Sequence, residues 1–208
     1  IRLVKETKRT KFDETVEVHV RTGLNVRHAD EQLRGTIALP HGLGKDVKIA
    51  VFAKGDKARE AEEAGADVVG GEDLAERIRG GFLDFDVVLA TPDMMKVVGG
   101  LGRVLGPRGL MPNPKTGTVT NDLRRTIEEY KAGKVNYRAE SGGVVHANIG
   151  KVSFDVDALV DNFETFYRAV VKAKPSGAKG IYIRKVYLSS TMGPSVRVDM
   201  KSIPVEGA

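Results

Sequence analysis

Residues 47–91 read VKIAVFAKGDKAREAEEAGADVVGGEDLAERIRGGFLDFDVVLAT, in which short apolar runs alternate with longer charged ones. The apolar runs are rich in valine and have the length of buried strands, whereas the charged runs repeat their apolar side chains at helical spacing. Strands that are apolar throughout are typical of a parallel sheet that helices cover on both faces. This order predicts strands at 47–53, 66–70 and 85–91 and helices at 56–65 and 72–79.

The sequence on both sides of this segment has a different periodicity. Residues 14–21, ETVEVHVR, alternate between valines and polar side chains, which indicates a strand with one face buried and the other in water. Residues 155–174 carry a stripe of apolar side chains at helical spacing, which predicts a long helix that lies on a sheet. Further strands are expected at 34–39, 135–140, 144–149, 180–188 and 194–200, the last two joined as a hairpin.

These patterns predict an α/β fold with two domains. We expect residues 43–133 to form an inserted, three-layer, Rossmann-like α/β domain. Residues 1–42 and 134–208 are expected to form one discontinuous α+β domain with a mostly antiparallel sheet. Three glycines lie where the chain crosses between the two predicted domains, and we expect them to act as a hinge: Gly42, Gly44 and Gly133.

The charge of the chain is unevenly divided between the predicted domains. The whole sequence holds 33 Lys and Arg against 28 Asp and Glu, a net charge of +5. The discontinuous domain accounts for 19 of the basic and 13 of the acidic residues, whereas the inserted domain holds 14 and 15. A basic domain beside a neutral one favours a polyanionic partner, nucleic acid first, although an excess of this size also arises by chance.

Several classes of protein are disfavoured by composition. The chain has no cysteine, which fits a reducing compartment and removes disulfides, thiolate metal sites and cysteine nucleophiles. It has no apolar run of about 18 residues and does not begin like a signal peptide, so we expect no membrane association and an intracellular location. Because the first residue is Ile1 rather than methionine, we expect a further segment to precede it.

Enzyme motifs in the sequence are incomplete. The glycines of residues 100–106 have the wrong spacing for a dinucleotide fingerprint, and Lys45 lacks both the first glycine and the Ser or Thr of a phosphate-binding loop. The four histidines show no spacing of metal ligands, so we predict neither a catalytic nor a metal site. The glycine- and proline-rich residues 99–119 are expected to pack on their own sheet, with contact to RNA or protein through their basic side chains as the alternative.

Six segments of the chain resemble one known family. TKFDETVEVHV, LPHGLGK, AEEAGADVVGGEDL, FDVVLATPDMM, LGRVLGPRGLMPNPKTGTV and STMGPSVRVD occur in the order found in the bacterial ribosomal protein L-one family, the protein of the mobile stalk beside the tRNA exit site. The resemblance spans about Lys5 to Asp199. It implies a cytoplasmic, ribosomal protein that is a monomer when free and needs no cofactor. Its implied partners are large-subunit rRNA, exit-site tRNA and the messenger RNA of its own operon, which it would repress.

Ten residues make up the RNA-binding site that we predict. The resemblance places RNA contacts on Lys11, Phe12, Thr15, Thr191, Met192 and Gly193. The physical expectation is that Lys11 neutralises phosphate, Phe12 and Met192 pack on bases or riboses, and Gly193 allows close backbone approach. We add Ser189 and Glu17 as partners of sugar, phosphate or base atoms, and Arg27 and Lys151 as basic residues of the same domain.

Two other functions remain open at this point. A nucleotide-binding α/β enzyme would use the inserted sheet and would need a phosphate-binding loop. A DNA-binding regulator would need a basic helix for the major groove, and the sequence has no helix-turn-helix pattern.

Overall fold

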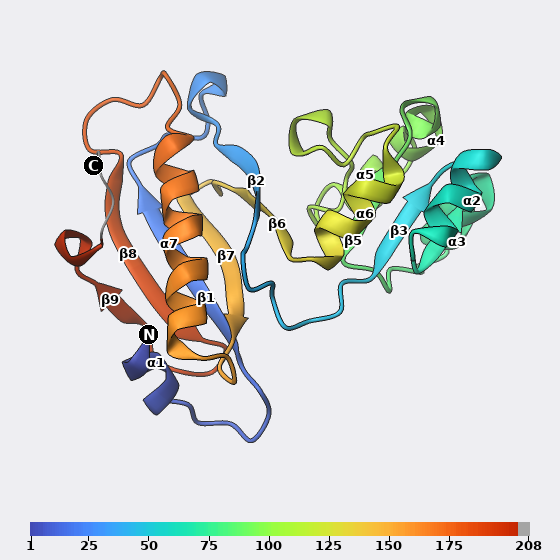
Figure 1. The fold of residues 1–208 in the computed structure, drawn as a ribbon. Helices are drawn as coiled ribbons and strands as arrows, with labels where there is room; N and C mark the ends of the chain where they lie inside the picture. Colours follow the sequence, from blue (N-terminus) through green and yellow to red (C-terminus); the bar gives the residue numbers. More distant parts are fainter. Residues whose placement is uncertain (204–208) are drawn as a thin grey trace. The chain divides into compact units, whose positions relative to one another are not determined.

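The computed structural model describes residues 1–203 of the chain. Contacts between residues divide the chain into two compact units (Figure 1). The discontinuous unit comprises Ile1–Gly44 together with the chain from Gly133 onward, and the inserted unit comprises Lys45–Ala132. These boundaries lie within two residues of those expected from the periodicity, and each unit is described separately below.

The inserted unit contains a three-stranded parallel sheet in the order β4-β3-β5. Its strands are β3 (Ile49–Phe52), β4 (Val68–Gly70) and β5 (Val87–Ala90), and its longer helices are α2 (Asp56–Glu63), α3 (Glu72–Arg79) and α6 (Leu123–Lys131). A parallel bridge between Ala90 and Val119 extends the sheet beside β5. The β-α-β-α-β order predicted from residues 47–91 is therefore present, with the same strands and helices.

Helices cover both faces of this sheet. Along the central strand β3, Ile49 and Val51 pack in a core with Leu123 and Ile127 of α6. The alternate residues of β3 pack on the other face, in a core that includes side chains of α3. All four residues of β3 are fully buried, which is why this strand is apolar throughout.

The glycine- and proline-rich connection between β5 and α6 packs on the second of these cores. It contains the short helices α4 (Met95–Gly99) and α5 (Gly102–Leu105) and the 3-10 turns Pro92–Met94 and Pro114–Thr116. Leu101 and Leu105 are fully buried, whereas the basic side chains of this connection are exposed. Packing on its own sheet, the first of the two expectations for this segment, is confirmed.

The discontinuous unit contains a four-stranded antiparallel sheet in the order β7-β1-β8-β9. Its strands are β1 (Thr15–Thr22), β7 (Val144–Lys151), β8 (Ile183–Ser190) and β9 (Val196–Val198). Strand β1 comes from the N-terminal part of the chain, and its two neighbours come from the part after the insertion. The expected hairpin is formed by β8 and β9, with Thr191–Ser195 between them.

Helix α7 (Val156–Lys172) lies across one face of this sheet, as Figure 1 shows. The valines of β1 and alternate residues of β7 and β8 point to this face and form the core with α7. The apolar stripe predicted for this helix is confirmed, and it also contains one polar residue, the fully buried Asn162. The helix covers only one face, so the polar side chains of β1 lie on the other, open face.

Two further strands form a separate two-stranded sheet. The sequence pattern had instead predicted a single sheet for this unit. Strands β2 (Arg34–Ala38) and β6 (Lys134–Arg138) are antiparallel to each other, and a lone bridge between Ala139 and Val145 connects β6 to β7. The Tyr137 ring packs edge-on against Phe166 of α7 with 5.6 Å between ring centroids. This contact packs the pair against α7.

The remaining elements of the discontinuous unit are short. They are α1 (Arg2–Glu6) and the 3-10 turns Ala29–Glu31 and Met200–Ser202. Within residues 1–203, no helix is both long enough and apolar enough to cross a lipid bilayer.

The two passages of the chain into and out of the insertion lie side by side in the discontinuous unit. Gly42 and Gly133 both have positive φ, at 64° and 112°, which is a conformation that favours glycine. A Cβ atom on Gly133 would lie 2.5 Å from the Cα of Gly42, so no other residue fits at this point. The Asn162 side chain accepts from His41 N (3.1 Å) and donates to the carbonyls of Gly42 (3.0 Å) and Ile149 (2.8 Å). The first passage is thereby fixed to the main sheet.

Candidate nucleic-acid interface

The open face of the main sheet is built by the polar half of each strand. Strand register places Glu17 of β1 between Asn148 and Ser189, and His19 between His146 and Tyr187. In an antiparallel sheet, directly opposite residues project to the same face. The alternation that buries the valines of β1 therefore presents a row of carboxylate, imidazole, amide and hydroxyl groups to solvent.

Basic side chains surround this row. Arg21 lies opposite Lys185 at one end of β1, and Arg197 of β9 lies opposite Tyr187. At the other end, the Nζ atom of Lys151 donates a 2.9 Å hydrogen bond to the hydroxyl of Thr15. Cations spaced along a polar sheet face can contact phosphates while the hydroxyl and amide groups between them contact sugars and bases.

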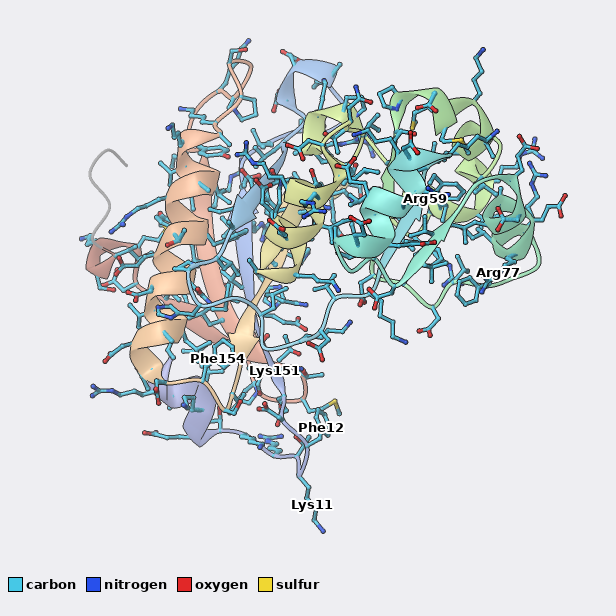
Figure 2. All side chains as sticks on the ribbon, turned by 45° about the vertical axis from the view of Figure 1, so that its right-hand side comes forward. Lys11, Phe12, Arg59, Arg77, Lys151 and Phe154 are labelled. Atoms are coloured by element: carbon cyan, nitrogen blue, oxygen red, sulfur yellow. The ribbon has the colours of Figure 1, made fainter. Side chains whose placement is uncertain are left out.

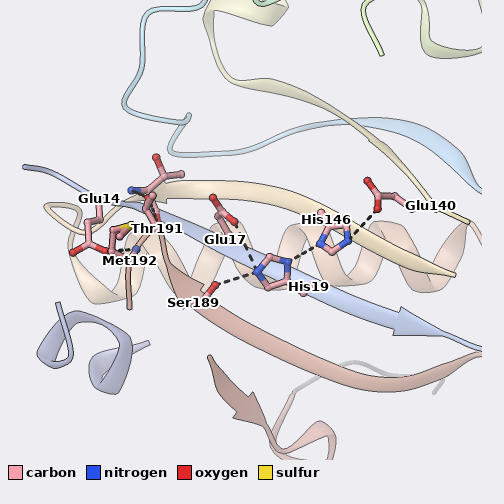
Figure 3. Close-up of polar contacts among 9 residues, drawn as sticks. Glu14, Glu17, His19, Glu140, His146, Ser189, Thr191 and Met192 are labelled. Carbon is pink, nitrogen blue, oxygen red and sulfur yellow. Dashed lines mark hydrogen bonds and ion pairs between the residues drawn. The ribbon is translucent and has the colours of Figure 1, made fainter. Parts of the chain in front are cut away.

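Two loops meet at the end of the sheet where β1 begins, and Glu14 joins them (Figure 3). Its carboxylate accepts from the hydroxyl of Thr10 at 2.7 Å in the loop before β1. It also accepts from the backbone N–H of Met192 at 2.9 Å in the turn after β8. Glu14 is fully buried by these neighbours, so it acts as an internal clamp between the two loops.

The contacts of Glu14 favour its charged form. The backbone N–H of Met192 is the main cause, with the hydroxyl of Ser190 and the contacts from Thr10 adding to it. Together they lower the pKa of the Glu14 carboxyl to about 2, against the opposing effect of its desolvation. The clamp therefore stays ionised at any pH at which the protein would meet RNA.

The clamp holds two apolar side chains out in solvent. Met192 is 62% exposed and Phe12 is 55% exposed, although both are large and apolar. Figure 2 shows Lys11 extending outward from the loop before β1, with Phe12 beside it. Neither side chain therefore belongs to the core. Exposed apolar side chains beside a basic, polar sheet face are suited to stacking on bases or riboses.

Thr191 and Gly193 have roles inside the turn. The Thr191 hydroxyl accepts from the backbone N–H of Thr15 at 3.1 Å, and the Thr191 N–H donates to the Thr15 carbonyl at 3.1 Å. A Cβ atom on Gly193 would lie 2.3 Å from the hydroxyl oxygen of Ser190. Both residues thus shape the turn that presents Met192, whatever contacts with RNA they make in addition.

A chain of polar side chains crosses the open face from β8 to the turn after β6. Ser189 Oγ lies 3.0 Å from His19 Nε2, and His19 Nδ1 lies 2.7 Å from His146 Nδ1. Carboxylates lie at both ends: Glu17 is 3.8 Å from His19 Nε2 and Glu140 is 3.7 Å from His146 Nε2. Desolvation of the His19 ring, and next the neighbouring His146, lower the pKa of His19, whereas Glu17 raises it.

The structure brings nine of the ten predicted residues to one surface. They are Lys11, Phe12, Thr15, Glu17, Lys151, Ser189, Thr191, Met192 and Gly193, on β1, the ends of β7 and β8 and the two loops that Glu14 joins. The tenth, Arg27, is exposed in the loop beyond the far end of β1. Arg27 is separated from the two loops by the length of that strand.

Three residues of this surface escaped the reasoning from sequence. Glu14 looked like one more polar residue at the start of a strand, and its position in DETVE gives no sign of burial. His19 and His146 are 127 positions apart, so their contact depends on strand pairing that the sequence does not reveal. The strict alternation in both strands was the available signal, because it places both imidazoles on the open faces.

The geometry agrees with a comparison to known protein families. Residues 4–194 match the sequence profile of the Ribosomal protein L1p/L10e family. The chain belongs to this family. The resemblance to the ribosomal protein L-one family, stated from the six sequence segments, is therefore confirmed, as are the mixed α/β class and the antiparallel and parallel sheets.

Family membership makes this chain a structural RNA-binding protein of the large ribosomal subunit. Ribosomal proteins of this kind are generally not enzymes, and their place is the ribosome. Among the described residues, no group of three or more His, Asp or Glu side chains is arranged to hold a metal ion.

Proposed function

We propose that the discontinuous unit of this L1p/L10e family protein binds large-subunit rRNA at the mobile stalk through one continuous surface. This surface consists of the open face of the main sheet and the two loops joined by Glu14. The observation that carries the proposal is the pair of exposed apolar side chains, Phe12 and Met192, that an ionised, buried clamp holds beside a polar sheet. The ten residues predicted from the sequence are the proposed contacts, with Arg27 at the periphery.

The shape of RNA explains why such a surface suits it. An A-form helix exposes a wide, shallow minor groove with its 2′-hydroxyls, and junctions expose bases that can stack on side chains. A sheet face offers hydroxyl, imidazole and carboxylate groups at regular spacing to 2′-hydroxyls, while Lys11 and Lys151 can neutralise phosphates. Glu17 would accept a hydrogen bond from a 2′-hydroxyl or a guanine edge rather than contact phosphate.

Titration of a stalk rRNA fragment with the full chain tests this surface. We expect Phe12→Ala to weaken binding by about 1–3 kcal/mol, roughly 5-fold to 150-fold, because it loses one aromatic stacking contact. Met192→Ala should weaken binding by about 0.3–1.5 kcal/mol, roughly 2-fold to 13-fold, because it loses the packing of the thioether on a base. Ile181→Ala is the matched control, because Ile181 is an exposed apolar residue of the same unit, 73% exposed, ahead of the other end of β8. Parent-like binding by both test variants would refute the proposed surface.

The finer roles implied by the family are also part of the proposal. The protein would assist release of deacylated tRNA from the exit site and would repress translation of its own operon by binding a messenger site that imitates the ribosomal one. Competition among stalk RNA, operon RNA and duplex DNA tests the second role, since both RNAs should displace the probe and the duplex should not. Exit-site tRNA release, measured on ribosomes with and without the protein, tests the first.

Movement between the units is proposed at Gly42, Gly44 and Gly133. Asn162 holds the carbonyl of Gly42 to the discontinuous unit, so movement of the first passage would begin after that carbonyl. Solution scattering of the free protein, which we propose to be a monomer, should require more than one arrangement of the units. A scattering curve that one rigid arrangement fits would contradict the hinge.

The alternative function, a nucleotide-binding enzyme, has less support. Two of the helices that follow strands of the parallel sheet, α2 and α3, carry acidic residues in their first turns: Asp56, Glu72 and Asp73. Carboxylates at a helix N-terminus repel the phosphates that such a site would bind. Calorimetry with common nucleotides would detect binding if this alternative were right.

A further inference from the structure

The contact between His19 and His146 restricts the protons that the two rings can carry. Their Nδ1 atoms are 2.7 Å apart, and a hydrogen bond at this distance needs one donor and one acceptor. Both rings therefore cannot be protonated at Nδ1 in this arrangement, and the pair holds two protons when neutral or three when singly charged. The singly charged state leaves both outer nitrogens, Nε2, protonated, whereas the neutral state leaves only one of them protonated.

The neutral pair has one favoured arrangement. If His19 donates through Nδ1, the remaining proton of His146 is on Nε2 and faces Glu140. The unprotonated Nε2 of His19 then accepts from the hydroxyl of Ser189, 3.0 Å away. Each arrangement turns one unprotonated Nε2 toward a carboxylate, either His19 toward Glu17 or His146 toward Glu140. The first is favoured because the Ser189 hydroxyl can donate to the unprotonated Nε2 of His19, whereas only the Glu140 carboxylate faces that of His146. In the neutral state, the Ser189 hydroxyl thus donates its proton to His19 and presents only lone pairs to solvent.

One added proton reverses the role of Ser189. With three protons, both Nε2 atoms are protonated, and each faces a carboxylate, Glu17 or Glu140. His19 Nε2 then donates to Ser189 Oγ, so the Ser189 hydroxyl is free to donate to an oxygen outside the protein. The open face gains one positive charge at the same time.

We propose that His19 and His146 are positioning residues that set whether Ser189 donates or accepts at the RNA-binding face, and that RNA binding is coupled to uptake of one proton by this pair. The inference rests on the proposed function, because it assumes that RNA occupies the open face. Phosphate and sugar oxygens are acceptors, so the singly charged pair, in which Ser189 donates, is the state that favours the complex.

The other groups around the pair are consistent with the uptake of one proton rather than two. The charged or titratable side chains that face it are Glu17 and Arg21 on β1, Glu140 in the turn after β6, Tyr187 and Lys185 on β8 and Arg197 on β9. Burial and the second ring lower the pKa of His19 in the free protein, which favours the neutral form of that ring. Nearby RNA phosphates would raise it, and that difference drives proton uptake on binding.

The experiment measures the affinity of the full chain for the stalk rRNA fragment at fixed salt from about pH 8 to about pH 6, the range in which histidine titrates. We expect the affinity to rise roughly fivefold to tenfold as the pH falls, with a slope of at most about tenfold per pH unit for one proton. His19→Gln and His146→Gln should each abolish most of this rise, and Ser189→Ala should reduce it. Ser189→Thr, which keeps a hydroxyl, should restore it.

The chain supplies its own controls, because it has four histidines. His28→Gln and His41→Gln change exposed histidines of the same unit outside the pair, and both should keep the parent's pH dependence. Nitrogen-15 NMR of the parent's imidazoles, with and without RNA, reads the same proton uptake without any substitution and guards against a variant that misfolds.

The possible outcomes separate the two proposals. Two results would overturn the proposed role of His19 and His146 and leave the proposed function intact. One is RNA binding that does not change with pH, and the other is a pH dependence that survives in His19→Gln and His146→Gln. Absence of binding to the stalk RNA at every pH overturns the proposed function, and with it the proposed role of the two histidines.

Discussion

The strands β1 and β3 show how two sheets in one chain come to differ in use. In β3, neighbouring residues go to opposite cores, and no part of the strand reaches solvent. In β1, the valines enter the core under α7, while Glu17, His19 and Arg21 remain on an open face. When helices cover both faces of a sheet, neither face can contact a partner. When one face is covered, the other is available for binding.

The largest expected effect comes from breaking the fully covered sheet. Phe52 of β3 is completely buried, so Phe52→Ala should destabilise the inserted unit by about 3–5 kcal/mol through lost burial and a cavity. Hydrogen exchange should show the loss of protection in residues 45–132, and affinity for stalk RNA should stay close to that of the parent. A parallel loss of RNA affinity would show that the two sheets are not separate in function.

A smaller effect is expected from the buried amide beneath the open sheet. Asn162→Leu removes hydrogen bonds to His41, Gly42 and Ile149, and leaves some of these backbone groups without partners. We expect a loss of about 1–3 kcal/mol in the discontinuous unit, measured by urea unfolding. Val160→Ala, a change on the same helix at a half-buried position without such bonds, serves as the comparison. Equal destabilisation by both variants would mean that the amide contributes nothing beyond its volume.

The clamp should make the turn at the end of the open sheet sensitive to acid. The pKa of Glu14 is about 2 in the folded state against an ordinary value of 4.5, so the charged form stabilises the fold. This contribution is complete above about pH 4.5 and is lost as the pH falls toward 2. The amide signal of Met192 in NMR should report the transition, and Glu14→Gln should remove it.

The exposed Glu6 on α1 provides the control for the clamp. Glu6→Gln removes the same charge without touching the turn, so the acid transition of the Met192 signal should persist in this variant. If the signal moved at the same pH in Glu14→Gln as in the parent, the clamp would not be its cause.

The smallest effect concerns a single charge at the edge of the open sheet. Lys11 is exposed and would meet one phosphate, so Lys11→Ala should reduce the slope of log affinity against log salt by about 0.7 to 0.9. Lys57→Ala, in α2 of the inserted unit, removes an equal charge and should leave the slope unchanged. An unchanged slope for Lys11→Ala would remove this residue from the proposed contacts.

Much of the fold could be predicted because periodicity reports burial. The apolar runs of residues 47–91 required two covered faces, and the alternation of β1 required one, so both sheets and the long helix follow from local patterns. The separate pairing of β2 with β6 did not follow, since a local pattern does not specify which strand is the partner.

The candidate site could be predicted only as far as the resemblance to the family reaches. Lys11, Phe12 and Met192 came from that resemblance, and their exposure in loops is a finding of the structure. Glu14, His19 and His146 acquire their roles from strand register, and the register of β1 with β7 contains an irregularity next to Glu17. A one-residue change in that register would separate the imidazoles, and no local pattern specifies it.

The close approach of Gly42 and Gly133 has a consequence for how the chain could be rebuilt. Because the two ends of the insertion leave the discontinuous unit at nearly one point, Lys45–Ala132 form a cassette. A short glycine linker should be able to replace that cassette without stretching the remaining backbone. Any other small domain whose own termini lie close together could be grafted in its place, as an exchangeable arm on an unaltered base.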